Sequence, residues 1–301
     1  METLLIVDSH ALIHRAYHAI PPLSTRSGIP TNALYGFINL IQKAIQDIKP
    51  SHLVTCFDTP TESFRKKIIT EYQATRKPTE DNLKIQFNIV KELVDAAHVS
   101  RFEADGYEAD DVIGTIVKQL SSQTLRVIIL TGDKDMFQLV TDHIYVLTPQ
   151  IGFSKSILYG PKEVEAKLGI PPDKVADYKA LSGDPSDNYG GIRNIGPKTA
   201  AKLITQYGAI ENMGGHFDDD TMNILRKMKQ VSTIVCDIPN INPKLEDLEF
   251  SGLKGEDFQL ALQKYELYSL LARFFPSDKK NIEVAKPKIK DLDPPSQDTL
   301  F

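Results

Sequence analysis

The sequence predicts an α/β domain with a central, mostly parallel sheet, followed by a helical region that contains a helix–hairpin–helix. Over residues 1–160, short apolar runs alternate with stretches whose apolar residues recur at helical spacing, which is typical of an α/β sheet. After Gly160 the strand-like runs stop, and helical patterns follow until the composition changes near residue 277. These observations predict two folded regions in a chain of 301 residues.

The expected strands are short runs rich in Leu, Ile and Val, the composition of strands that are buried on both faces of a parallel sheet. Between them, apolar residues three and four positions apart indicate helices that cover the sheet. We expect strands at 4–8 (LLIVD), 52–58 (HLVTCFD), 99–104 and 126–132 (RVIILTG), with helices at 32–48, 85–97 and 107–120.

The second region, residues 161–276, is expected to be helical throughout. Its helices are expected at 161–170, 173–183, 196–208, 221–236 and 258–275. Residues 277–301 are rich in Lys, Pro, Asp and Ser, with little apolar content, and this composition predicts a disordered tail.

Nine carboxylates lie at or just after the ends of apolar runs, or in turns. The carboxyl ends of parallel strands lie at one edge of a sheet, so we expect these side chains to meet there. At about 6 Å each pair would repel by roughly 3 kcal/mol, and divalent cations would offset that repulsion. Oxygen ligands without His or Cys favour two Mg²⁺ or Mn²⁺ ions over Zn²⁺. The nine are Asp8, Asp58, Glu108, Asp110, Asp111, Asp133, Asp135, Asp184 and Asp187.

Simpler readings exist for the individual groups. Acidic residues at 108–111 open a helix, where they also complement the helix dipole. Residues 184–187 have a composition that favours turns. His10, His14 and His18 have a spacing that could chelate zinc on one helix face, but no Glu or Cys completes such a site nearby, so we expect a surface or core role for them.

Two further segments indicate contact with nucleic acid. Residues 59–84 interleave basic residues with Phe64 and Tyr72, a mixture in which cations follow phosphates and rings stack on unpaired bases; a solvated charged helix is the alternative. In the hairpin at 191–200, small residues and a helix N-terminus favour a phosphate; a plain helix–turn–helix with Pro197 in its first turn is the alternative. The residues that we expect to contact DNA are Lys66, Lys67, Lys77, Gly191, Gly196, Lys198, Thr199 and Lys202.

The formal net charge of −5 would normally argue against a nucleic-acid partner. The nine clustered carboxylates account for this charge, however, and the rest of the chain is net basic. Residues 4–7 are too few for a signal peptide, and no run approaches 18 apolar residues, so we expect a cytoplasmic protein without a membrane segment. Cys56 and Cys236 are expected to be reduced thiols.

Taken together, the motifs resemble those of the 5′-nuclease family, which includes the 5′→3′ exonuclease domain of bacterial DNA polymerase I and the flap endonucleases. The resemblance covers about residues 3–278. It rests on VD at 7–8, HRAYHA at 14–19, NALYGF at 32–37, FDTPTESFR at 57–65, EYQATRKPT at 71–79, GYEADDVIGT at 106–115, TGDKDMFQLV at 131–140, ALSGDPSDN at 180–188 and GIRNIGPKTA at 191–200.

The resemblance implies a PIN-like or resolvase-like nuclease domain and a structure-specific 5′→3′ exonuclease or flap endonuclease that acts in replication and repair. It implies that the carboxylates from Asp8 to Asp111 hold one metal ion and that the four from Asp133 to Asp187 hold a second. Arg15, Arg65, Tyr72 and Arg76 match positions that steer the scissile phosphate and the 5′ strand. Residues 59–84 would form an arch over the site, and the hairpin would hold duplex DNA, with K⁺ at its loop.

The chain departs from the family pattern at three positions. Gln73 stands where a catalytic lysine is usual, and losing one positioned cation would slow the reaction by roughly 10²–10³-fold. Asn194 replaces the usual second glycine of the hairpin, and asparagine tolerates the left-handed backbone. Gly190 stands where proline is usual. No polymerase domain follows, so we expect a freestanding nuclease that is a monomer.

The last residues, QDTLF, look like the peptide by which bacterial replication proteins bind the sliding clamp, with Gln297, Leu300 and Phe301 as its contacts. Two other functions stay open. The chain could be a PIN-like ribonuclease, against which the hairpin and the arch argue. It could also be a DNA-structure-binding protein with weak catalysis because of Gln73, against which the complete carboxylate set argues.

Overall fold

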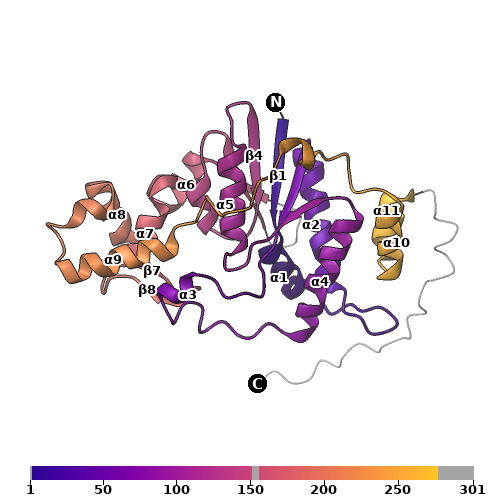
Figure 1. Ribbon diagram of the computed structural model, residues 1–301, viewed down its shortest axis with the longest axis horizontal. Helices are drawn as coiled ribbons and strands as arrows, with labels where there is room; N and C mark the ends of the chain where they lie inside the picture. The colour runs from indigo at the N-terminus through magenta and orange to yellow at the C-terminus, as the bar shows by residue number, and fades with distance from the viewer. Residues whose placement is uncertain (1, 151–155, 277–301) are drawn as a thin grey trace, which may run out of the picture.

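The computed structural model describes residues 2–150 and 156–276, and it contains a six-stranded sheet flanked by helices, with a helical region beside it (Figure 1). The order of the strands is β3-β2-β1-β4-β5-β6. Strands β1 to β5 run parallel and β6 pairs antiparallel with β5. The strands are β1 Glu2–Asp8, β2 His52–Cys56, β3 Ser100–Phe102, β4 Leu125–Leu130, β5 Ile144–Pro149 and β6 Ser156–Tyr159.

Helices cover both faces of the sheet because successive side chains of β1 point to opposite sides. Leu4 and Ile6 pack in one core with α5, whereas Leu5 and Val7 pack in the other with α2 and α4. The helices of this part are α1 Ser9–Ala19, α2 Asn32–Ile48, α4 Asp81–Ala96 and α5 Ala109–Leu120. The expected α/β architecture is therefore confirmed.

Strand β1 lies between β2 and β4, and here the order of the strands reverses. The chain proceeds outward to β2 and β3 on one side, and to β4 and β5 on the other. At such a point the loops that leave neighbouring strands diverge and open a crevice at the carboxyl edge of the sheet.

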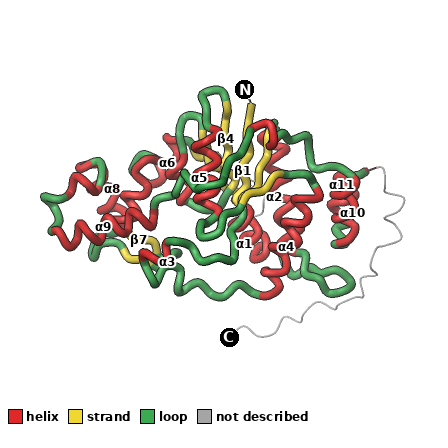
Figure 2. The backbone as a smooth tube through the Cα atoms, viewed as in Figure 1, coloured by secondary structure: helices red, strands yellow, loops and turns green. Residues whose placement is uncertain are grey.

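The helical region extends away from the sheet (Figure 2). Its elements are α6 Pro161–Leu168, α7 Val175–Ser182, the short strands β7 Gly183–Asp184 and β8 Tyr189–Gly190, α8 Pro197–Tyr207 and α9 Asp219–Ser232. The last two helices, α10 Glu256–Lys264 and α11 Tyr268–Phe274, pack instead against α4 and the sheet core. Residues 161–276 therefore have two packing partners rather than forming the one region that we expected.

Several local predictions differ from the structure. Strands β5 to β8 were not expected. The single helix expected at 258–275 is broken, and Glu266 in the break has a left-handed backbone (φ 55°). Within residues 59–84 the structure has only the short helix α3 Arg65–Ile68 and the first turn of α4.

Within the described ranges, no helix combines the length and the apolar character needed to cross a membrane. The tail at 277–301, with Gln297, Leu300 and Phe301, lies outside the described residues.

Candidate metal centre and DNA-contact surface

Three carboxylates reach the crevice directly from strand ends. Asp8 is the last residue of β1 and also the N-cap of α1, where Oδ1 accepts a hydrogen bond from the Ala11 amide at 3.1 Å. Asp58 follows β2, and Asp133 follows β4. Thr131 joins two of these loops, because its hydroxyl donates to Asp8 Oδ2 at 2.6 Å and accepts from the Asp133 amide at 2.9 Å.

The N-terminus of α5 contributes two further carboxylates. Glu108 is the N-cap of α5 and Asp110 lies in its first turn. The Asp58 carboxylate accepts a 2.6 Å hydrogen bond from the Ala109 amide, which ties this helix to the end of β2. The positive end of the helix dipole offsets part of the negative charge that gathers here.

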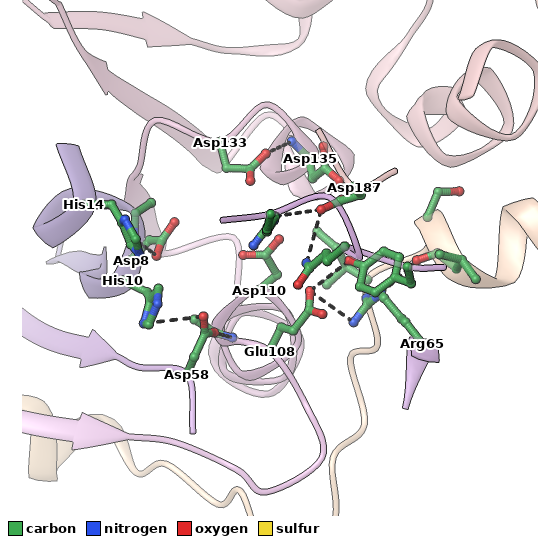
Figure 3. A pocket seen from close by; sticks show the side chains of 18 of the residues that line it. Asp8, His10, His14, Asp58, Arg65, Glu108, Asp110, Asp133, Asp135 and Asp187 are labelled. Atoms are coloured by element: carbon green, nitrogen blue, oxygen red, sulfur yellow. Dashed lines mark hydrogen bonds and ion pairs between the residues drawn. The ribbon is translucent and has the colours of Figure 1, made fainter. Parts of the chain in front are cut away.

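These side chains line a cavity of about 430 Å³ (Figure 3). A second pocket of about 540 Å³ adjoins it, and Asp133 and Asp135 line both. Eight of the nine predicted carboxylates line one or both pockets: Asp8, Asp58, Glu108, Asp110, Asp133, Asp135, Asp184 and Asp187. The expected meeting of distant carboxylates at one edge of the sheet is thus present.

We define the first carboxylate cluster as Asp8, Asp58, Glu108, Asp110 and Asp133. Burial, followed by the charges of Asp133 and Asp8, raises the pKa of Asp110 well above its usual range. Burial raises the pKa of Asp8 to about 7, although hydrogen bonds from Thr131 and Ala11 oppose the shift. Glu108 Oε1 is buried with no hydrogen-bond partner in the described chain. An orphaned carboxylate oxygen among buried acids fits a site built for a divalent cation.

The raised pKa of Asp8 predicts how the stability of the metal-free protein changes with pH. Between about pH 4 and pH 7 the folded state retains a proton that the unfolded state has lost, so the free energy of unfolding falls as pH rises. This proton on Asp8 changes the free energy of unfolding by about 4 kcal/mol at most. Urea unfolding in EDTA measures it as the difference between the wild type and Asp8→Asn across this window. A difference that grows in favour of the wild type as pH rises would contradict the expectation.

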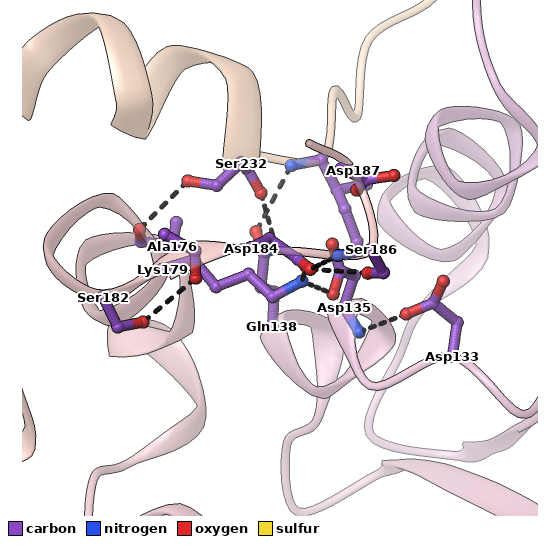
Figure 4. A network of polar contacts seen from close by, with 12 residues as sticks. Asp133, Asp135, Gln138, Ala176, Lys179, Ser182, Asp184, Ser186, Asp187 and Ser232 are labelled. Atoms are coloured by element: carbon purple, nitrogen blue, oxygen red, sulfur yellow. Dashed lines mark hydrogen bonds and ion pairs between the residues drawn. The ribbon is translucent and has the colours of Figure 1, made fainter. Parts of the chain in front are cut away.

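We define the second carboxylate cluster as Asp135, Asp184 and Asp187, whose oxygens lie within 4.8 Å of one another. The short pair β7–β8 holds the loop that carries Asp184 and Asp187. Lysine and arginine side chains pair with all three of its carboxylates: Lys179 pairs with Asp135 and Asp184 (Figure 4), and Arg76 pairs with Asp187. Arg76 and Gln73 both donate to Asp187 Oδ1, at 2.6 and 3.1 Å.

Two predicted site residues form a buried structural pair instead. Arg65 donates to both oxygens of Asp111, at 2.7 and 2.8 Å, and also to the Val231 and Thr233 carbonyls. Asp111 is fully buried and Arg65 is 3% exposed. In this arrangement Asp111 and Arg65 neutralise each other, and Arg65 also lines the first cavity, 3.6 Å from Glu108. A metal contact of Asp111 and a phosphate contact of Arg65 stay predictions.

The other basic and aromatic residues of 59–84 divide into two groups. Tyr72 is buried, donates to Glu108 at 3.2 Å and packs beside Tyr189, so it is not an exposed platform for a base. Tyr72, Gln73, Arg76 and Lys77 line the first cavity, so this segment forms part of its wall. Lys67 is exposed, and Lys66 pairs with Glu62 outside the cavity. Arg15 lines the second pocket beside Gly132.

The three histidines of α1 form a row of rings rather than a metal site. His10 stacks on Phe87 with ring centroids 4.2 Å apart, and its Nδ1 lies 3.4 Å from Asp58. Burial, followed by the charges of the neighbouring His10 and His18, lowers the pKa of His14 to about 4. The residues that the structure describes offer no group of metal ligands that includes these histidines.

The hairpin between α7 and α8 has the expected turn. Asn194 takes the left-handed backbone (φ 67°), and Gly196 caps α8 with Pro197 at its first position. A Cβ at Gly191 would lie 2.2 Å from the Leu181 carbonyl, so the chain requires glycine there for backbone packing. Lys198, Thr199 and Lys202 are exposed on α8.

Sequence reasoning missed Thr131 and Lys179 at the site. Thr131 immediately precedes the loop of Asp133, which is a local signal. Lys179 lies five residues before Asp184, but this spacing alone does not indicate a contact. The structure shows it, because α7 points Lys179 back at the loop that follows it.

Two family models match consecutive parts of the chain. Residues 3–169 match the 5′-3′ exonuclease N-terminal resolvase-like domain, and residues 170–256 match the 5′-3′ exonuclease C-terminal SAM fold. The chain belongs to the 5′-3′ exonuclease family. The expected family and its resolvase-like fold are confirmed.

Relatives of this 5′-3′ exonuclease family member differ in length. The chain is 37% identical to DNA polymerase I of Caldicellulosiruptor bescii, over 95% of the chain and 35% of that protein. It is 34% identical to DNA polymerase I of Bacillus subtilis, over 90% of the chain and 32% of that protein. The chain thus spans about a third of these polymerases. It is also 34% identical to the 5′-3′ exonuclease of Aquifex aeolicus, over 90% of the chain and 94% of that protein.

Solved structures share the fold of this family member. Zinc-bound T5 5′-exonuclease aligns with a TM-score of 0.60 at 19% identity, over 94% of this chain and 99% of that one. The T5 D15 flap endonuclease in a complex with DNA and metal ions aligns with a TM-score of 0.59 at 18% identity, over 94% and 98%. The catalytic core of Rad2 with DNA aligns with a TM-score of 0.54 at 16% identity, over 94% and 92%.

Proposed function

We propose that the chain is a metal-dependent, structure-specific 5′→3′ exonuclease and flap endonuclease that hydrolyses phosphodiester bonds near 5′ ends of DNA. One observation carries the proposal: eight carboxylates line two adjoining pockets at the switch point of the sheet, with a buried and unpartnered Glu108 oxygen among them. The family membership and the DNA- and metal-bound T5 relative support it. Primer and flap removal in replication and repair is the proposed role.

The two clusters would hold two Mg²⁺ or Mn²⁺ ions, the first by Asp8, Asp58, Glu108, Asp110 and Asp133, and the second by Asp135, Asp184 and Asp187. Bound there, the ions would supply a water of lowered pKa and neutralise charge on the reacting phosphate. Thr131 orients Asp8 and the loop of Asp133, and Asp58 keeps α5 against the sheet. Arg76 and Lys77, which line the same cavity as Asp8, would attract the phosphate of an incoming strand.

Exposed cations on the hairpin helix α8 would bind the duplex next to the cut site. Lys198 and Lys202 are one helical turn apart, and phosphate contacts of this kind do not read sequence. Recognition should therefore follow DNA shape and weaken with salt. We propose K⁺ as a further ligand of the hairpin loop, a monomeric state, and a cytoplasmic, nucleoid-associated location.

A panel of substrates tests the proposed function. With Mg²⁺, a 5′ flap with a free end should be cleaved, whereas the same flap with a bulky adduct on its end, and a closed single-stranded circle, should be resistant. Asp133→Asn should be inactive on all of them. If Asp133→Asn cleaved these substrates as fast as the wild type, the proposal would be excluded. Cleavage of the circle as fast as the flap would also exclude it, and would favour a less selective, ribonuclease-like enzyme.

Replacing Gln73 by lysine should accelerate flap cleavage by about tenfold or more, because it adds a cation at the wall of the cavity. The backbone of Gln73 is left-handed (φ 57°), and its N–H donates a hydrogen bond to the Asp187 carbonyl. Neither feature involves the glutamine side chain, so lysine can take the same backbone conformation and make the same hydrogen bond. Single-turnover rates of the wild type and Gln73→Lys measure the effect, and Gln73→Met is the uncharged control. An unchanged rate would mean that Arg76 and Lys77 already supply the charge.

We propose that the residues at 297–301 bind the sliding clamp through Gln297, Leu300 and Phe301. Deleting these five residues should abolish clamp pull-down while leaving flap cleavage without the clamp unchanged. Pull-down that persists after the deletion would exclude this contact.

A further inference from the structure

We propose that Lys179 is a built-in competitor for the metal ion at the second carboxylate cluster, so that a divalent cation must displace its ammonium group to bind there. The inference rests on the proposed use of metal ions at Asp135, Asp184 and Asp187. It goes further because it gives one residue outside the carboxylate set control over how readily the second ion enters.

The position of Lys179 carries the first step. Its ammonium group pairs with Asp135 and lies 2.5 Å from Asp184 Oδ2, so it bridges two of the three residues of the cluster (Figure 4). Its side chain is 12% exposed, as is that of Asp184. A divalent ion would need those same oxygens at about 2.1 Å, so the ion and the ammonium group cannot occupy this space together.

The two clusters differ in how their charge is balanced. Across residues 2–150 and 156–276, no lysine or arginine forms an ion pair with Asp8, Asp110 or Asp133 of the first cluster. In the second cluster, Lys179 forms ion pairs with Asp135 and Asp184, and Arg76 forms one with Asp187. In the first cluster, Arg65 lies 3.6 Å from Glu108 and His10 lies 3.4 Å from Asp58, so cationic partners reach only these two of its five carboxylates. A cation entering the second cluster must instead displace Lys179 from two of three carboxylates.

Lys179 is better placed than Arg76 to oppose the ion. The Arg76 side chain is 55% exposed, so solvent and salt screen its pair with Asp187. Lys179 lies in the last turn of α7, where the negative end of the helix dipole also favours a cation. Because its two pairs are sheltered, removing its charge should change metal affinity more than removing that of Arg76.

The experiment is a titration of the full chain with Mn²⁺. Calorimetry measures the heat of binding, and the electron paramagnetic resonance signal measures the free Mn²⁺. Lys179→Gln should strengthen the second, weaker binding step by about tenfold, equivalent to 1.4 kcal/mol, and leave the first step within about twofold. Without metal, Lys179→Gln should unfold at lower temperature, because the second cluster loses its counter-charge.

Two variants separate competition from a general structural effect. Lys229 also bridges two carboxylates, Asp177 and Glu211, outside the clusters, so Lys229→Gln should lower stability without strengthening Mn²⁺ binding. Lys179→Arg keeps a cation and should keep the second step weak.

The possible outcomes separate this inference from the proposed function. If the second step in Lys179→Gln is unchanged or weaker while the first step is normal, the competition proposal alone is overturned. If the wild type and Lys179→Gln bind no Mn²⁺ at either step, the metal-dependent function fails as well.

Discussion

Replacing Asp110 by asparagine is expected to slow Mg²⁺-dependent flap cleavage by about 10³-fold or more and, at the same time, to stabilise the metal-free protein. The two effects have one cause. Asp110 is half-buried among Asp8, Asp133 and Glu108, and desolvation, followed by the charges of these neighbours, raises the pKa of its carboxyl. A bound divalent ion would offset the repulsion among these carboxylates. Without the ion, the same repulsion lowers the free energy of unfolding.

The magnitudes follow from that arrangement. A ligand that positions a catalytic ion accounts for several kcal/mol of transition-state stabilisation, and each 1.36 kcal/mol is about tenfold in rate. Removing an uncompensated buried charge should raise the free energy of unfolding in EDTA by about 1–3 kcal/mol. Single-turnover cleavage measures the first effect and urea unfolding in EDTA the second.

Asp142→Asn is the matched control, since Asp142 is exposed and lines neither pocket. It should change neither the cleavage rate nor the stability. If Asp110→Asn keeps its activity, Asp110 is not a metal ligand. If it loses both activity and stability, Asp110 has a structural role that the cluster alone does not explain.

Replacing Arg65 by alanine is expected to destabilise the protein by about 3–5 kcal/mol, whether or not metal is present. The change would leave the Asp111 carboxylate fully buried without its bidentate partner. It would also free the Val231 and Thr233 carbonyls, through which α3 is held to the end of α9. Urea unfolding with and without Mg²⁺ measures the loss.

The neighbouring Lys66→Ala should change stability by less than about 1 kcal/mol, because its pair with Glu62 is exposed. Arg65→Lys should give an intermediate loss, since lysine keeps the charge but cannot make the two parallel hydrogen bonds. If Arg65→Ala is as stable as the wild type but cleaves slowly, the guanidinium contacts DNA, and the role implied by the family resemblance would be restored.

The sequence could place carboxylates at one edge of the sheet where position along a strand determines position in space. LLIVD, HLVTCFD and RVIILTG are buried parallel strands, and their carboxyl ends share one edge, so Asp8, Asp58 and Asp133 had to meet. Period-3.6 patterns likewise predicted α2, α4 and α5. Strand β5, which pairs parallel with β4, was not predicted.

The structure adds what the sequence could not show where orientation around a helix start decides the contacts of a side chain. Glu108, Asp110 and Asp111 are adjacent in sequence, and all three were expected to bind metal. In the structure Glu108 and Asp110 line the cavity, whereas Asp111 caps α5, points into the interior and meets Arg65. The partner of Asp111 comes from 46 residues earlier in the chain, and no local pattern could have indicated it.

The sequence by itself determined the family, the α/β sheet and the set of carboxylates at its carboxyl edge, because these depend on local periodicity and on motifs of fixed spacing. Only the tertiary structure decided which charges are free and which are paired. Arg65 neutralises Asp111 in the interior, Lys179 and Arg76 pair with the second cluster, and in the described chain Asp8, Asp110 and Asp133 of the first cluster have no lysine or arginine partner. Pairing of this kind is decided by three-dimensional distance, which separation along the chain does not reveal.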